Sequence, residues 1–202
     1  MVCFLSKTSR RSQESIVKWY TLKLKRQVSS IRIRGKIIKK LYIGIDCMKS
    51  HITSEVLDKV FFNDGSLRDI YVLGVDLGDW QKFYEWIYLS SWETKLYKDG
   101  LETVNEKKNV IKLFEDKEIH SILLSIDIDG AALINCHFFS IDEMEFDANP
   151  IEIKSLYEAN AVFEFMRKLS SILGKEIILT EENTPEHPLV TIKSDNTLFI
   201  HI

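Results

Sequence analysis

Four carboxylates in the second half of the chain have a spacing that could bring them together. Asp127 and Asp129 lie two residues apart, and so do Glu143 and Glu145. Because alternate residues of a β-strand point to the same face, neighbouring strands would gather all four on one face of a sheet. Such a cluster could bind Ca²⁺ or Mg²⁺, or supply an acid and a base. A solvated sheet face explains the same pattern, so no metal site is assigned.

The chain has no motif for nucleophilic catalysis or phosphate binding. Cys136 and His137 are adjacent in an expected strand, so their side chains point to opposite faces and cannot form a dyad. The other four His residues are scattered, and the sequence lacks the common hydrolase, nucleotide-binding and zinc motifs. We therefore expect a protein that is not an enzyme, with no catalytic or metal-ligating residues and no cofactor.

The composition is that of a globular protein. The chain has 202 residues, of which 45% are hydrophobic and 28% charged, and this excludes collagen, low-complexity and disordered acidic chains. No apolar run approaches the roughly 18 residues of a membrane-spanning helix, and three Cys are too few for a disulfide scaffold. The basic residues follow a short apolar N-terminal stretch, which reverses the order of a secretory signal. We expect a cytoplasmic protein without membrane contacts.

Charge is distributed very unevenly along the chain. Residues 1–40 contain 12 Lys and Arg residues and one acid, Glu14, whereas residues 41–202 contain 15 basic and 29 acidic residues. A basic arm on an acidic body is typical of a protein that contacts nucleic acid or a membrane surface. Two unrelated pieces of coding sequence joined together would show the same contrast.

The change in composition also predicts a domain boundary. It falls near Asp46, and compact-domain patterning begins at Met48. We expect residues 1–47 to form a basic N-terminal extension, either disordered or an artefact of an upstream start. Residues 48–202 are expected to form a single acidic α+β domain. A true basic arm is the alternative for the first segment.

The first half of this domain is predicted to alternate helices and strands. The patterns predict a helix over 52–60, a strand over 67–73, a helix over 80–89, a hairpin over 95–104 turning at Asp99-Gly100, and a helix over 105–114 capped by Asn105. The strand over 67–73 is apolar on both parities, which favours a place inside a sheet. Asp76 and Asp79 both suit the N-cap of the helix over 80–89, whose aromatic side chains should pack in the core.

The second half carries the strongest strand pattern. A hairpin is predicted over 122–139 around Asp129-Gly130, followed by strands over 143–147, 175–180, 190–193 and 197–201. Ser155 and Glu158 match a capping box for a helix to about Leu173, and Gly174 suits its left-handed C-terminal position. The expected fold class is α+β: a mainly antiparallel sheet, built from a meander and a C-terminal hairpin, covered on one face by two main helices.

Acidic side chains are the remaining functional feature. From Met48 onward the chain has 15 basic and 28 acidic residues, and such a field attracts basic partners and raises association rates. A role in keeping the protein soluble is the competing explanation for this excess of acidic residues. Three acidic clusters could contact a partner: Glu115, Asp116 and Glu118; Asp142, Glu143, Glu145 and Asp147; and Glu181 with Glu182. We take the members of the last two as the candidate partner-binding residues, and neighbouring aromatic side chains could serve as buried anchors.

Three segments resemble known proteins in their order of elements. Residues 66–87, 123–153 and 163–189 contain, in turn, a D-W-x-x-F helix, an H-F-F strand and an E-N-x-P loop. They resemble small, uncharacterised bacterial cytosolic proteins that are similar to the immunity proteins accompanying polymorphic toxins. The resemblance implies a monomeric or dimeric α+β protein that blocks a toxin by binding, without catalysis.

These observations favour a non-enzymatic acidic binding protein, an immunity-type inhibitor that masks a basic toxin such as a nuclease. One alternative is a nucleic-acid-associated protein that uses the basic arm 1–40. The other is a divalent-metal-dependent enzyme that uses the carboxylates Asp127, Glu143 and Glu145. A homodimer is left open in each case.

Overall fold

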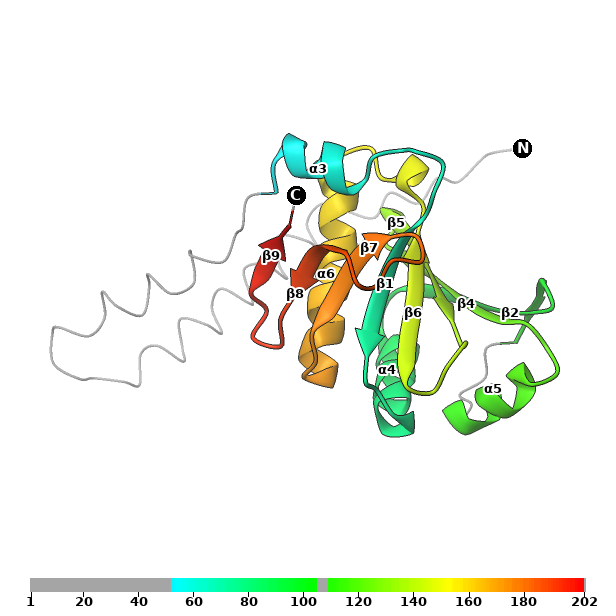
Figure 1. Ribbon diagram of the computed structural model, residues 1–202. Coiled ribbons are helices and arrows are strands. Elements are labelled where there is room, and N and C mark those ends of the chain that lie inside the picture. Colours follow the sequence, from blue (N-terminus) through cyan, green and yellow to red (C-terminus); the bar gives the residue numbers. More distant parts are fainter. Residues whose placement is uncertain (1–51, 105–108, 202) are drawn as a thin grey trace, which may run out of the picture. The chain divides into compact units, whose positions relative to one another are not determined.

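The computed structural model describes residues 52–104 and 109–201 (Figure 1). The chain divides at Ser50–His51 into two units, and the described residues belong to the second. The expected extension over residues 1–47, its boundary at Met48 and the expected cap Asn105 lie outside the described residues.

In the described ranges, nine strands form one antiparallel sheet in the order β3-β2-β4-β5-β6-β1-β7-β8-β9. The strands are β1 (Arg68–Leu73), β2 (Glu93–Lys98), β3 (Leu101–Thr103), β4 (Ile122–Ile128), β5 (Ala132–His137), β6 (Glu143–Ala148), β7 (Ile177–Glu181), β8 (Pro188–Ile192) and β9 (Leu198–Ile200). β4, β5 and β6 make the predicted meander, and β8 and β9 make the C-terminal hairpin. β1 pairs with β6 and β7, so the prediction of a strand inside the sheet is confirmed.

Four α-helices occur in the described part of the chain, and the two longest cover one face of the sheet. They are α3 (Ser54–Val60), α4 (Leu77–Leu89), α5 (Val110–Lys117) and α6 (Leu156–Leu173), with a short 3₁₀ turn at Pro150–Glu152. In Figure 1, α4 and α6 lie behind the central strands, and no helix crosses in front of β1 and β6. The α+β prediction is therefore confirmed.

Aromatic rings join the helices to the sheet. The Trp80 ring on α4 stacks on Phe138 at 5.1 Å between centroids, and its indole N–H donates to the Ile141 carbonyl at 3.0 Å. Phe83 meets Phe146 of β6 edge to face at 5.2 Å. The predicted core role of this helix face is confirmed for these rings. It is wrong for Tyr88, which is 43% exposed near the end of α4.

Helix starts account for two further corrections. α4 begins at Leu77, because the Asp76 carboxylate accepts from the Asp79 amide and caps the helix three residues earlier than predicted. Asp79 lies in the first turn and pairs with Lys82 at 2.8 Å. α5 is capped by Asn109, whose side chain accepts from the Ile111 amide.

Two Asp-Gly turns and the helix α6 lie where the sequence predicted them. Asp99-Gly100 and Asp129-Gly130 all have positive φ, between 52° and 75°. Asp99-Gly100 forms the predicted two-residue turn, whereas the β4–β5 loop has one residue more, Ala131, because Ile128 pairs with Ala132. The capping box of Ser155 and Glu158 is present at the start of α6. Gly174 ends this helix with φ 66°, a backbone conformation that side chains with a Cβ atom adopt at a cost.

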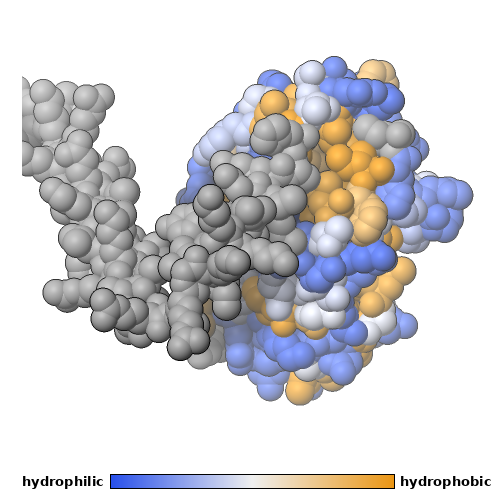
Figure 2. All heavy atoms as spheres, turned by 90° about the vertical axis from the view of Figure 1, so that its left-hand side faces the viewer, coloured by the Kyte–Doolittle hydropathy of each residue, from blue (hydrophilic) through white to orange (hydrophobic). Residues whose placement is uncertain are grey.

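The outer strands β3 and β9 are each three residues long, which limits their pairing with other chains. Figure 2, seen from the side of β9, shows apolar surface bordered by hydrophilic residues. At this edge the Lys193 ammonium lies 4.9 Å from the centre of the exposed Phe199 ring. No helix in the described residues is long and apolar enough to cross a membrane.

Candidate functional site: an acidic face of the sheet

The face of the sheet opposite the helices carries carboxylates instead of apolar side chains. On β6, Met144 and Phe146 are buried in the core beneath α4 and α6. Glu143, Glu145 and Asp147 alternate with them and so point to the opposite face. Three of the predicted partner-binding residues are therefore gathered on one surface, which we call the acidic face.

β1 adds two polar side chains that the sequence did not single out. Asp69 lies opposite Asp147 and Tyr71 opposite Glu145 in the β1–β6 pairing. The Tyr71 hydroxyl donates to the Asp69 carboxylate at 2.9 Å, and the Asn183 amide donates to the same oxygen at 2.7 Å. The sequence analysis did not select Asp69 as a site residue, because both faces of its strand are mostly apolar. The signal that could have found it is its position two residues before Tyr71, which places the two polar side chains on the same face.

A row of hydrogen bonds crosses three strands on this face. The Ser125 hydroxyl donates to the Asn135 side-chain oxygen at 3.0 Å, and the Asn135 amide donates to Asp147 at 2.9 Å. The second Asp147 oxygen lies 2.6 Å from His137 Nε2. The His137 ring stacks on Phe139 with 4.9 Å between centroids. These contacts fix Asp147 and place an aromatic ring beside the carboxylates.

The carboxylates of the acidic face lie close enough to disfavour each other's ionisation. Burial raises the pKa of Glu143, and the charge of Asp142 raises it further. Burial also raises the pKa of Glu145, with a smaller contribution from Asp69. Among the described residues, no Lys or Arg forms an ion pair with any of these carboxylates. The face therefore carries negative charge that lysine and arginine pairing does not neutralise.

Asp69 is buried within the same face. Desolvation raises its pKa, although the hydrogen bonds from Asn183 and Tyr71 act in the opposite direction. The charges of Asp147 and Glu182 raise it further, so Glu182 lies near the acidic face. The Glu182 carboxylate also accepts from the Leu67 amide at 3.2 Å.

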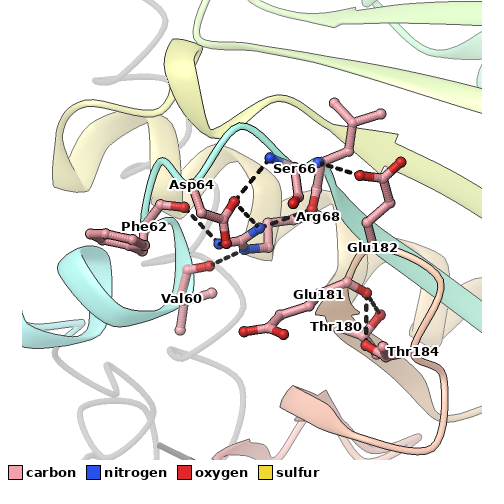
Figure 3. Close-up of polar contacts among 10 residues, drawn as sticks. Val60, Phe62, Asp64, Ser66, Arg68, Thr180, Glu181, Glu182 and Thr184 are labelled. Carbon is pink, nitrogen blue, oxygen red and sulfur yellow. Dashed lines mark hydrogen bonds and ion pairs between the residues drawn. The ribbon is translucent and has the colours of Figure 1, made fainter.

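The remaining predicted partner-binding residues divide between the two sides of the sheet. Asp142 precedes Glu143 in the β5–β6 loop and accepts from the Ser140 hydroxyl, so it borders the acidic face. Glu181 has the parity of the buried Leu179, and Figure 3 shows its carboxylate pointing away from that of Glu182. Glu181 therefore does not belong to the acidic face.

The expected gathering of Asp127 and Asp129 with Glu143 and Glu145 is wrong. Asp127, near the end of β4, accepts from the Gly130 amide in the β4–β5 loop at 2.6 Å, and Asp129, within that loop, lies 3.3 Å from the Trp92 indole nitrogen. β5 separates them from β6. No group of three or more His, Cys, Asp and Glu residues in the described ranges is arranged to hold a metal ion.

Cys136 and His137 lie on opposite faces, as their adjacency in a strand predicted. The Cys136 thiol is fully buried in the core, and burial raises its pKa well above the ordinary value. His137 lies on the acidic face. The pair therefore cannot act as a nucleophile and base.

A second cluster of polar contacts surrounds Arg68 at the start of β1 (Figure 3). Nε donates to the Val60 carbonyl at 2.8 Å and Nη2 to the Phe62 carbonyl at 2.6 Å. The remaining N–H groups reach the Asp64 carboxylate and the Leu67 carbonyl. All five donors of the guanidinium are used within the chain. This cluster connects α3 to the sheet and leaves no donor for a ligand.

A hollow of about 590 Å³ lies between α4 and the start of α5. It is open, and Gln81 at its wall accepts from the Val110 amide at 3.3 Å. Glu85 is the only titratable side chain among its described lining residues. One carboxylate does not make an acid–base pair, so the acidic face remains the better candidate.

No protein-family model, curated protein or solved structure matches this chain. An account of its function therefore starts from the geometry and charge of the acidic face.

Proposed function

We propose that this protein is a non-enzymatic, immunity-type inhibitor that masks a basic toxin in the bacterial cytoplasm. One observation carries the proposal: carboxylates from β1, β6 and the adjoining loops converge on a sheet face without lysine or arginine partners among the described residues. A basic protein surface supplies the missing cations.

The position of the charges suits binding better than catalysis. Asp147 and Asp69 are buried and accept hydrogen bonds within the chain, so they hold the face in shape while the half-buried Glu143 and Glu145 remain for a partner. Preorganised charges steer association and select against partners of like charge. The face is a sheet surface, whereas catalytic groups are usually enclosed in a pocket that excludes water.

The test is a comparison of the full chain with two charge-matched double variants. E143Q/E145Q removes two carboxylates from the acidic face. E152Q/E164Q removes two exposed carboxylates from the helix-bearing side, at the 3₁₀ turn and on α6. Each is used to capture proteins from lysate of the source cell. We expect a basic protein to be retained by the wild type and E152Q/E164Q and to be lost from E143Q/E145Q.

A cell-growth assay then distinguishes an inhibitor from a protein that only binds. The retained protein should arrest growth when expressed alone, and coexpression of the wild-type chain should restore growth where E143Q/E145Q does not. Equal retention by the two double variants would refute a role for the acidic face.

Nucleic-acid association remains the second proposal, because 12 Lys and Arg residues lie within residues 1–40. It predicts that the chain retains nuclease-sensitive material. This retention should be the same for E143Q/E145Q and the wild type, and it should fall steeply as the salt concentration rises. A divalent-metal enzyme predicts instead that Mg²⁺ or Ca²⁺ raises the melting temperature.

A further inference from the structure

Exposed apolar side chains border one end of the acidic face. Phe139, Leu73 and Ile141 are 62%, 51% and 45% exposed. Leu73 shares a parity with Tyr71 and lies directly opposite Glu143 in the β1–β6 pairing, so its side chain is on the acidic face. The Phe139 ring lies against His137, which is paired with Glu145. An aliphatic and an aromatic surface therefore flank two carboxylates.

The other end of the face is closed to a partner. Asp69, Tyr71 and Thr180 are buried, and the Asn183 backbone contacts Asp69 directly. Glu143 and Glu145 are only half-buried. Solvent, and therefore a partner, reaches the face at the end that Leu73 and Phe139 border.

The lysines nearest to this end are already engaged. Lys117 donates to the Phe139 carbonyl at 2.6 Å and pairs with Glu118 at 3.9 Å. Lys175 donates to the Gly74 carbonyl at 2.8 Å and lies 3.5 Å from an Asp79 oxygen. Both contact backbone at the border, and within the described ranges neither forms an ion pair with Glu143 or Glu145.

We infer that this end of the acidic face receives an arginine side chain of the basic partner. The inference rests on the proposed function, and it specifies which cation is recognised. The guanidinium plane stacks on the exposed Phe139 ring and its N–H groups donate to Glu143 and Glu145, while its aliphatic stem packs on Leu73.

Lysine cannot reproduce this set of contacts. Its ammonium is a compact, strongly hydrated charge, whereas the guanidinium is planar, more weakly hydrated, and able to stack and to form two parallel hydrogen bonds at once. The combination of an aromatic ring face and adjacent carboxylates therefore favours arginine over lysine. A carboxylate cluster without a ring would not discriminate between the two cations.

The experiment compares nona-arginine and nona-lysine peptides, each fluorescently labelled, binding to the full chain at moderate salt. Four chains are used: the wild type, F139L, F199L and E143Q/E145Q. F139L keeps an apolar side chain but removes the ring face, and F199L makes the same change at the exposed ring of β9. Melting curves establish that each variant is folded.

We expect nona-arginine to bind the wild type and F199L at least about fivefold more tightly than nona-lysine, the size of roughly one cation–π contact. F139L should lower the affinity for nona-arginine to that for nona-lysine and leave nona-lysine binding unchanged. Equal affinities for the two peptides, both weakened by E143Q/E145Q, would overturn the arginine inference and leave the proposed basic partner intact. Binding that is insensitive to both F139L and E143Q/E145Q would overturn both.

Discussion

The guanidinium of Arg68 is 1% exposed, yet among the residues that the structure describes it has a single charged partner, Asp64. Its other donors bind backbone carbonyls at the end of α3 and the start of β1. A backbone N–H from Ser66 and the guanidinium itself lower the pKa of Asp64, so the pair stays ionised near neutral pH. The buried charge is therefore balanced by one carboxylate and three backbone carbonyls, one of which, that of Phe62, also accepts from the Asp64 amide.

Substituting Arg68 by Met should therefore be strongly destabilising. The apolar side chain fills similar space but removes the guanidinium donors from three carbonyls and a carboxylate, of which, within the described residues, only the Phe62 carbonyl and Asp64 keep another donor. We expect a loss of about 3 kcal/mol or more in the free energy of unfolding. Urea denaturation measures it. Lys59→Met, which removes an exposed pair with Glu55 on the same helix, should cost less than about 0.5 kcal/mol. Comparable losses for the two variants would refute this account.

Glu145 should lower stability at neutral pH. Its pKa is raised in the folded chain, so the folded state binds more protons than the unfolded state between the two pKa values. Stability then falls as pH rises through that window and stays lower above it. Glu145→Gln should melt at a higher temperature than the wild type at pH 7, and the difference should vanish near pH 4. A difference independent of pH, or one shared by the exposed Glu152→Gln, would contradict the argument.

At the scale of elements, the sequence predicted correctly those turns and helix ends that depend on interactions between residues close together in the chain. The Asp-Gly turns, the capping box at Ser155 and the end of α6 at Gly174 each depend on residues within a few positions of each other. The start of α4 was misplaced because two aspartates three residues apart both suit an N-cap, and the tertiary contact of Asp79 with Lys175 is not visible in the sequence.

The capping box gives an element-scale prediction. Ser155→Ala removes the acceptor for the Tyr157 amide at the start of α6 and should cost about 1 kcal/mol of stability. Since α6 spans the sheet and packs on α4, the loss should appear in the global unfolding transition, measured by urea denaturation. Ser54→Ala, at an exposed position in the first turn of α3, is the matched control and should change stability by less than about 0.5 kcal/mol. A negligible loss for Ser155→Ala would show that packing alone positions this helix.

At the scale of the whole molecule, the order of strands creates the candidate site. The alternation on β6 predicted that Glu143 and Glu145 share a face, but nothing local predicted that β1 would insert beside β6 and bring Asp69 opposite Asp147. The same long-range order removed Asp127 from the cluster, because β5 lies between β4 and β6. Strand order is determined by packing of the complete core, and a parity pattern contains no information about it.

Net charge and local charge make different predictions for association. The whole chain has a formal charge of only -3, so attraction of a basic partner depends on where the acidic side chains lie, and we expect the acidic face to provide it. The association rate of nona-arginine with the full chain should fall by about tenfold between low and high salt, because screening shortens the range of surface charges to within about 10 Å at 0.1 M. Dissociation should change less.

Stopped-flow fluorescence of the wild type, E143Q/E145Q and E152Q/E164Q checks this expectation. E143Q/E145Q should associate more slowly than the wild type at low salt and show a shallower salt dependence, so that the two rates converge as salt rises. E152Q/E164Q carries the same net charge as E143Q/E145Q and should keep the wild-type slope. Identical slopes for the two double variants would mean that total charge, and not its placement on the sheet, governs encounter with a cationic partner.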